Sequence, residues 1–120
     1  VLLQLFHTTK IRVRYGETDQ MGIVYHGNYA QYLEMGRIEL LRMLGISYKQ
    51  MEKEGVILPV LSININFKKS AFYDDVLKVK TQISKMPSVR IEFDYEITLC
   101  VYVFVSNPQT VMECNVMQMT

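Results

Sequence analysis

The hydrophobic and polar positions of the chain follow a two-residue period near its start. In the stretch 5–15, Ile11, Val13 and Tyr15 fall on one face and basic residues fall on the other. This alternation predicts a half-buried β-strand. Glycines then break residues 16–28 into a loop.

The period becomes helical after Asn28, which is a candidate cap, with His26 and Gly27 as alternative helix starts. A stripe of apolar positions, with neighbours along its edge, predicts one long helix over residues 29–44. The stripe contains Tyr29, Leu33, Gly36, Leu40 and Leu44, edged by Ala30, Arg37 and Leu41. Gly45 suits the helix end, and Ser47 predicts a short second helix over residues 48–53, closed by Gly55.

Alternation returns in residues 56–68, 76–86 and 89–98, which predicts three strands of an antiparallel sheet. Each strand has one apolar face. These faces are Leu61, Ile63, Ile65 and Phe67 in the first, Leu77, Val79, Thr81 and Ile83 in the second, and Val89, Ile91, Phe93, Tyr95 and Ile97 in the third. Residues 86–88 predict the turn between the last two.

Residues 89–105 contain no turn residue, and one strand of that length would span about 56 Å at about 3.3 Å per residue. Strands are rarely so long. We therefore expect residues of a hairpin loop to be missing near 98–101 and treat residues 102–105 as a separate final strand. The tail after Pro108 is given little weight.

A strand, one long helix and then several strands predict an α+β fold in a single domain, residues 1–120. A helix of about 17 residues, at 1.5 Å per residue, can cross about five strands spaced about 4.8 Å apart. We expect an antiparallel sheet of about five strands wrapped around this central helix.

Composition argues against several classes of protein. The net charge of +1 gives no reason to expect nucleic acid or an acidic membrane as the main partner. No apolar run approaches the length of a membrane span, and the first residues lack the basic flank of a signal peptide. Cys100 and Cys114 lack metal-ligand spacing, so we expect reduced thiols in a cytoplasmic protein. No cofactor or metal motif is present.

The stretch 15–37 combines an acid, a tight turn, a histidine and the helix start. Asp19 precedes Gly22, and His26 lies at the helix entrance. A helix N-terminus offers unpaired N–H groups and a positive partial charge to an oxyanion. A carboxylate can supply a nucleophile or a general base. Together they indicate acyl chemistry.

The sequence Tyr-x-Glu-Thr-Asp-x-x-Gly-Ile-Val-Tyr-His-x-Asn-Tyr, followed by Tyr-Leu-Glu and Arg37, resembles the hot-dog-fold acyl-CoA thioesterases of the 4-hydroxybenzoyl-CoA thioesterase type. Residues 67–75 are similar to the family's second recurring segment, with Ser70 where a proline is usual. The resemblance covers residues 11–97. It implies the hot-dog fold and a homodimer, often a dimer of dimers, whose sheets join edge to edge with active sites between subunits.

By this resemblance Asp19 matches the catalytic aspartate, which attacks the thioester carbonyl or activates a water. Its residue type also fits a turn aspartate that bonds backbone amides. At His26 the resemblance implies that the backbone N–H polarises the thioester oxygen, with the ring assisting in the branch that has Tyr-His here. The alternative for His26 is an ordinary polar loop residue.

Further residues are candidates for substrate contact. Tyr15, Tyr25 and Asn28 could line the acyl end or orient the acid, although tyrosines of a small domain serve equally as core residues. The basic candidates for the CoA phosphates could equally be solvated charges. They are Lys68, Lys69 and Arg90.

Glu34 and Arg37 lie three positions apart on the predicted helix and are expected to pair, because a guanidinium among leucines needs a partner. The alternative is that Glu34 is the catalytic carboxylate, since some hot-dog thioesterases use an acid on the helix.

We therefore expect hydrolysis of an acyl-CoA substrate to free acid and CoA, without a cofactor. Two alternatives stay open. One is a hydroxyacyl dehydratase on the same fold, which would pair a histidine with a carboxylate. The other is a non-catalytic module that binds acyl-CoA or an acyl carrier.

Overall fold

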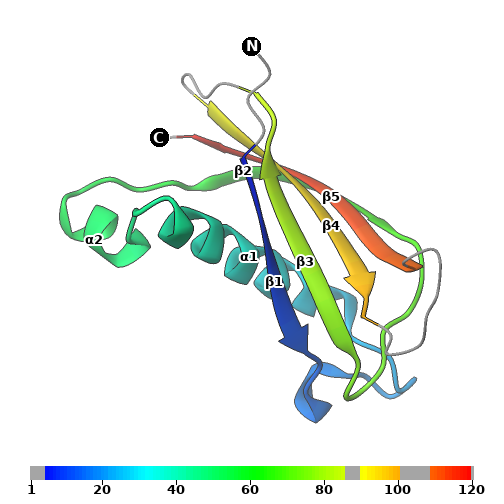
Figure 1. Ribbon diagram of the computed structural model, residues 1–120. Helices are drawn as coiled ribbons and strands as arrows, with labels where there is room; N and C mark the ends of the chain where they lie inside the picture. Colours follow the sequence, from blue (N-terminus) through cyan, green and yellow to red (C-terminus); the bar gives the residue numbers. More distant parts are fainter. Residues whose placement is uncertain (1–4, 86–89, 101–108, 120) are drawn as a thin grey trace.

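The computed structural model describes residues 5–85, 90–100 and 109–119. Within them, five strands form one antiparallel sheet in the order β1-β3-β4-β5-β2, so that β1 and β2 are its edges. The strands are β1 Leu5–Arg12, β2 Val60–Phe67, β3 Val76–Ile83, β4 Arg90–Leu99 and β5 Gln109–Met119. The long helix α1, Tyr29–Met43, lies across one face of this sheet, and the short helix α2, Tyr48–Lys53, follows it (Figure 1). The expected α+β architecture is confirmed.

Helix α1 packs its buried side mainly against β1 and β3. The predicted stripe is confirmed at Tyr29, Leu33, Gly36 and Leu40, which are buried. It is wrong at Ala30 and Leu44, which are exposed, and Tyr32 is fully buried although the stripe omitted it. The helix therefore presents a side rotated slightly from the predicted one.

Gly36 lets the helix approach β3 closely. A Cβ atom at this position would lie 2.4 Å from Thr81 Oγ1 and 2.9 Å from Val79 Cγ1. Distances this short exclude a side chain unless the helix or the strand moves, since interiors are already close-packed.

The predicted C-terminal end of α1 and the predicted start of α2 are confirmed. Gly45 has a φ of +81°. Its N–H donates to the carbonyl of Arg42, and that of Ile46 donates to Leu41. These are the bonds that close a helix around a left-handed glycine. Ser47 Oγ accepts the N–H of Gln50 at 3.2 Å and so caps α2, as predicted.

The first strand ends earlier than its alternation indicated. β1 stops at Arg12, and Tyr15 belongs to a short 3-10 turn, η1 Tyr15–Glu17, with 77% of its surface exposed. Val13 pairs with the turn before β3, because its N–H donates to Asp75 and its carbonyl accepts from Asp74. Val13 is therefore buried, and the chain leaves the sheet before Tyr15 can share its face.

The second and third of the predicted strands are confirmed as β3 and β4. Of the residues on their predicted apolar faces, Val89 lies outside the described residues, Ile91 is half-buried, and the others are buried. These residues are Leu77, Val79, Thr81 and Ile83 of β3 and Phe93, Tyr95 and Ile97 of β4.

The first of these three predicted strands, residues 56–68, behaves differently. β2 begins at Val60 rather than Val56, and Leu61, Ile63 and Phe67 are exposed. As an edge strand it has a neighbour, β5, on one side. The expectation of one dry face is therefore not met within a single chain.

β5 arises from the tail after Pro108, where no strand was predicted. β4 continues through Thr98 to Leu99, and Cys100 N–H still donates to Val76, so the chain does not break at residue 98. The predicted turn at 86–88 and the predicted final strand at 102–105 lie outside the described residues.

Candidate functional site

Asp19 sits in a loop that its own backbone bonds hold closed. Thr18 and Val24 pair as an antiparallel bridge, and Asp19 N–H donates to the carbonyl of Ile23 at 2.9 Å. Gly22, with a φ of +80°, donates to the carbonyl of Asp19. A positive φ at this turn favours glycine over every other residue.

The Asp19 carboxylate is half-buried and fixed on one side. Its Oδ1 accepts the N–H of Met21 at 2.8 Å, which is the bond of a turn aspartate. Among the described residues no donor bonds Oδ2. The turn role is thus real but leaves one carboxylate oxygen available to another molecule.

The segment after β2 lies directly beside this loop. Val24 N–H donates to the carbonyl of Ala71 at 2.8 Å, and Ile23 forms an isolated bridge with Phe72. The two stretches that carried the family resemblance are therefore neighbours in space.

The entrance of α1 is a second 3-10 turn, η2 His26–Asn28, preceded by Tyr25. Tyr25 provides no side-chain cap. Asn28 N–H donates to the carbonyl of Tyr25, but within the described part of the chain no acceptor bonds the N–H groups of His26 and Gly27. A helix start normally leaves such donors, and they are available to an oxygen atom of a ligand.

His26 is exposed, and its imidazole lies beside two aromatic rings. Its centroid lies 4.4 Å from that of Tyr25 and 6.5 Å from that of Phe67. Phe67, the last residue of β2, also packs edge-on against Tyr29, with 5.3 Å between the two ring centroids. The ring of His26 thus lies between the helix entrance and the end of β2.

A cavity of about 430 Å³ opens between the loop, the helix entrance and the end of β2. Its volume lies in the usual range for small-molecule sites, about 300–1,000 Å³. It brings together four predicted residues, Asp19, His26, Lys68 and Lys69. Six further residues line it: Met21, Ile23, Val24, Tyr29, Phe67 and Ser70.

Four other candidates do not line this cavity. Tyr15 is exposed and packs edge-on against Tyr73, at 5.6 Å between ring centroids. Tyr25 is 47% exposed beside His26. Asn28 does not cap the helix with its side chain, because its Nδ2 donates to the carbonyl of Glu17 at 2.7 Å.

The fourth, Arg90, lies at the far end of the sheet. It pairs with Met119 at the start of β4, whereas Ile97, Met112 and Phe67 are level with the cavity. The intervening length of strand is about 23 Å at about 3.3 Å per residue. Arg90 is therefore not part of the same site within one chain.

Sequence reasoning missed Glu17, two positions before Asp19. Glu17 is 9% exposed, and its carboxylate accepts hydrogen bonds from Tyr32 Oη at 3.0 Å and Arg14 N at 2.8 Å. Burial by itself raises the pKa of Glu17, but the bonds from Arg14 and Tyr32 outweigh it, and the pKa is lowered overall. The sequence offered one signal for this residue, the three-residue spacing between Arg14 and Glu17, which is suited to an ion pair.

Arg37 does not pair with Glu34, contrary to the sequence expectation. Arg37 is 7% exposed, and its Nη1 donates to Tyr95 Oη on β4 at 3.1 Å, whereas Glu34 is exposed. Burial raises the pKa of Tyr95, with Arg37 acting against the shift. Arg37 is structural, and Glu34 does not line the cavity.

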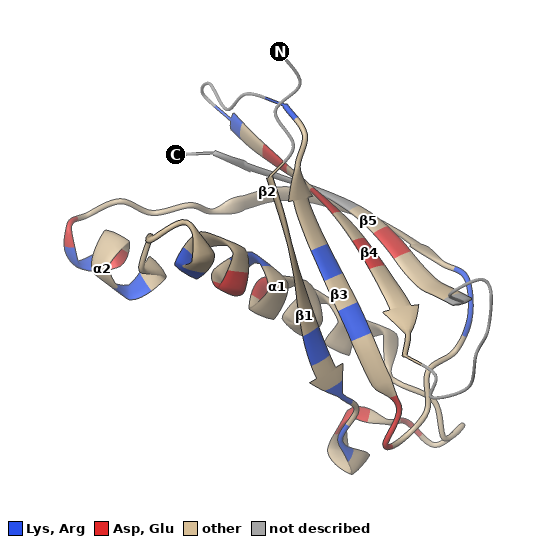
Figure 2. Ribbon diagram, viewed as in Figure 1, with Lys and Arg blue, Asp and Glu red and all other residues tan. Residues whose placement is uncertain are grey.

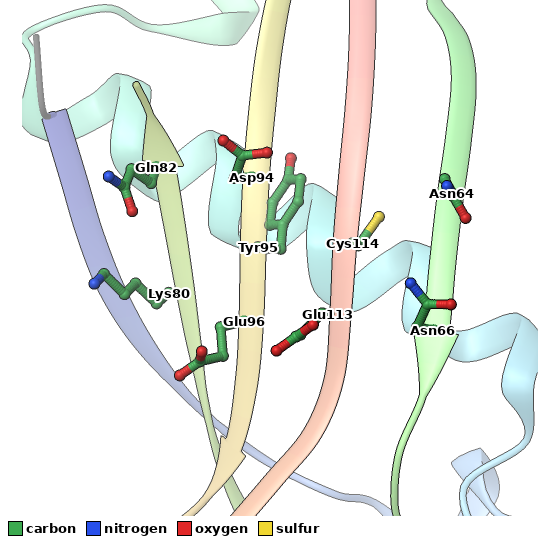
Figure 3. A pocket seen from close by; sticks show the side chains of 9 residues that line it. All are labelled: Asn64, Asn66, Lys80, Gln82, Asp94, Tyr95, Glu96, Glu113 and Cys114. Carbon is green, nitrogen blue, oxygen red and sulfur yellow. The ribbon is translucent and has the colours of Figure 1, made fainter. Parts of the chain in front are cut away.

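A second hollow, of about 370 Å³, lies on a polar part of the sheet (Figure 3). Its charged lining residues are Lys80, Asp94, Glu96 and Glu113. Acidic residues also gather on β4 and β5 in Figure 2. Acids outnumber bases here, so the field disfavours an anionic ligand, whereas Lys68 and Lys69 favour one at the first cavity.

Cys114, which also lines the second hollow, is not a candidate nucleophile. Burial raises the pKa of this thiol to about 11. Thiols react as thiolates, so this one is protonated and inert near neutral pH.

No group of three or more His, Cys, Asp and Glu side chains suited to a metal ion occurs among the described residues. No α-helix in the described ranges combines the length and apolar character that a membrane crossing needs.

The sequence of this chain is similar to those of known proteins. Residues 21–99 match the model of the thioesterase superfamily. The Bacillus subtilis (strain 168) protein YneP, provisionally named an acyl-CoA thioesterase, is 46% identical over 93 residues, which is 76% of this chain and 67% of YneP. The chain spans 66%, 52% and 47% of three other curated relatives.

Solved structures share the fold. A DHNA-CoA thioesterase from Staphylococcus aureus has a TM-score of 0.86 and 38% identity, covering 95% of this chain and 72% of that one. The 4-hydroxybenzoyl-CoA thioesterase from Pseudomonas sp. strain CBS-3 has a TM-score of 0.82 and 24% identity, covering 95% and 83%. At that identity the second comparison concerns the fold alone. The predicted hot-dog fold is confirmed.

Proposed function

Because the chain belongs to the thioesterase superfamily, we propose that it hydrolyses acyl-CoA thioesters to a free acid and CoA at the Asp19 cavity. The observation that carries this proposal is the composition of that cavity. Asp19, with one unbonded carboxylate oxygen, and His26, with an unbonded backbone N–H, line the same space.

In the proposed reaction the thioester carbonyl oxygen points toward the N–H groups of His26 and Gly27. These donors stabilise the negative charge that develops on that oxygen. Asp19 Oδ2 either attacks the carbonyl carbon, giving an acyl-aspartate anhydride that water then cleaves, or takes a proton from an attacking water. In both routes the C–S bond breaks and CoA leaves as a thiolate, which a thiol's low pKa makes a good leaving group.

Lys68 and Lys69 supply positive charge at the same cavity. We propose that they contact phosphate groups of CoA, for which a lysine ammonium is a suitable point charge. Arg90 has no part in this contact within one chain, because it lies at the other end of β4.

We further propose a homodimer formed through β2. This edge strand leaves one side unpaired and exposes Leu61 by 42% and Ile63 by 41%. An exposed apolar edge strand tends to pair with another strand. A partner's β2 would cover these residues and lie close to Phe67, and thus to the cavity. The dimer of dimers and the cytoplasmic location stay predictions.

A panel of acyl-CoAs assayed by thiol release tests the activity. Turnover of at least one member, lost in Asp19→Asn, is the expected result. Binding without turnover of any member would favour the acyl-binding module. Formation of an enoyl product without thiol release would instead favour the dehydratase.

A further inference from the structure

Glu17 joins the Asp19 loop to the helix entrance through its main chain. Its carbonyl oxygen accepts the N–H of Tyr25 at 2.9 Å and Nδ2 of Asn28 at 2.7 Å. Both donors belong to the few residues that surround the unbonded N–H groups of His26 and Gly27. The root of the loop and the start of α1 are therefore tied at one residue.

The Glu17 side chain makes a second tie, deeper in the protein. Oε1 accepts the phenol of Tyr32, which is fully buried one turn inside α1, and the N–H of Arg14. Oε2 accepts Nη2 and Nε of Arg14 at 3.1 and 3.3 Å. Every bond of this buried carboxylate thus holds either the chain entering the loop or the helix.

The Asp19 loop is closed by hydrogen bonds between its own residues. The bridge between Thr18 and Val24 and the bond from Asp19 N–H to Ile23 lie within it. A loop of this kind takes its position from whatever anchors its root. Val24 and Ile23 also tie the loop to Ala71 and Phe72 after β2, but that segment is not part of the helix entrance. Neither Asp19 nor Gly22 bonds α1 directly, so among the described residues Glu17 supplies the hydrogen bonds between the root of the loop and the helix.

We infer that Glu17 is a positioning residue: its bonds to Tyr32, Tyr25 and Asn28 set the separation between the Asp19 carboxylate and the free N–H groups of the helix entrance. This inference rests on the proposed thioesterase function. Misplacing reacting groups by about 1 Å can lower a rate about 10²-fold. Glu17 does not line the cavity and so does not contact substrate.

The test compares steady-state kinetics of four variants on one acyl-CoA. Glu17→Ala removes the side-chain anchor and should lower kcat about 10- to 100-fold with KM changed by less than about twofold. Tyr32→Phe removes only the hydrogen bond to Glu17, so it should also lower kcat, but by less than Glu17→Ala. Glu17→Gln keeps an acceptor for Tyr32 and for Arg14 N–H, so it should retain most of kcat.

Ile83→Ala is the matched control. Ile83 is 5% exposed and lies at the far end of β3, opposite Leu5, so its truncation destabilises the fold without touching the loop. It should lower the melting temperature but leave kcat near that of the wild type. In the double variant Glu17→Ala/Tyr32→Phe the kcat losses should not add, because both remove the same bond.

The outcomes separate this inference from the proposed function. Wild-type chain that hydrolyses acyl-CoA, together with a Glu17→Ala variant no slower than Ile83→Ala, would overturn the positioning role alone. Additive losses in the double variant would overturn it too. Wild-type chain with no hydrolysis would overturn the proposed function, and the positioning role with it.

Discussion

Tyr32, inside the long helix, donates a hydrogen bond to Glu17, fifteen residues earlier, at 3.0 Å. The bond crosses from the buried side of α1 to the root of the loop that carries Asp19. It shows that the candidate site is held by tertiary contacts as well as by the local turn. The packing of α1, the Glu17 carboxylate, the lysines at the cavity, the edge strand β2 and the Asp19 carboxylate can each be tested by a substitution of its own.

Gly36→Ala should destabilise the fold. The added methyl group would meet Thr81 and Val79 at less than 3 Å. Overpacking of this kind usually costs about 1–3 kcal/mol, which outweighs the gain of about 1 kcal/mol in helix propensity. Urea denaturation measures the change. Gly16→Ala, at a position with open space around it, is the control; equal stability of wild type and Gly36→Ala would show that the helix has room to move.

The stability of the wild type should depend on Glu17 in a pH-dependent way. The folded pKa of Glu17 lies below its ordinary value of 4.5, so the carboxylate stabilises the fold above that pH. This contribution is lost as the pH falls through the folded pKa. Unfolding free energies of wild type and Glu17→Gln should therefore differ at pH 7 and converge in acid. A difference that does not shrink below pH 4.5 would mean that the carboxylate's charge is not stabilising.

Replacing Lys68 and Lys69 by alanine should weaken substrate binding more than catalysis. Loss of exposed ion pairs with phosphate should raise KM about two- to fivefold at low salt, and less at high salt. An acyl-pantetheine substrate, which lacks the nucleotide, should not distinguish the variant from the wild type. Lys53→Ala, on the remote helix α2, is the control. An equal rise in KM for both substrates would argue against phosphate contact.

Ile63→Lys should leave the folded chain intact but prevent pairing through β2. Ile63 is already 41% exposed in the single chain, so a lysine there adds little strain until a second β2 approaches. Light scattering after size-exclusion chromatography gives the mass. Thr8→Lys places the same charge on the other edge strand, β1, and should leave the dimer unchanged. A dimer in Ile63→Lys would place the interface elsewhere.

Local rules were enough to predict the elements whose causes are local. Gly45 ended α1 and Ser47 capped α2 because each acts on residues within one turn. The alternation in β3 and β4 was read correctly because both strands are central and have a strongly apolar face. Asp19 and His26 were predicted from a short motif, and the structure brings both to one cavity because only six residues of loop separate them.

The rest depended on contacts distant in sequence. Arg37 bonds Tyr95, 58 positions away, so its neighbour Glu34 was a misleading partner. Arg90 was misplaced because its distance from the cavity is set by strand register. β5 was missed because it forms by pairing with β4 and β2, which flank it in the sheet, and β2 lies far from it in the sequence. Glu17 is buried through bonds to both Arg14 and Tyr32, and the sequence spacing indicates the first alone.

The most direct measurement of the central claim is the kcat of Asp19→Asn beside that of His26→Ala on the same acyl-CoA. The amide of Asp19→Asn keeps an oxygen for the N–H of Met21, so the loop should stay folded while the nucleophile or base is lost. We expect kcat to fall about 10²- to 10⁴-fold in Asp19→Asn, and to fall less in His26→Ala, because alanine retains the backbone N–H. Full activity of a correctly folded Asp19→Asn variant would contradict the account.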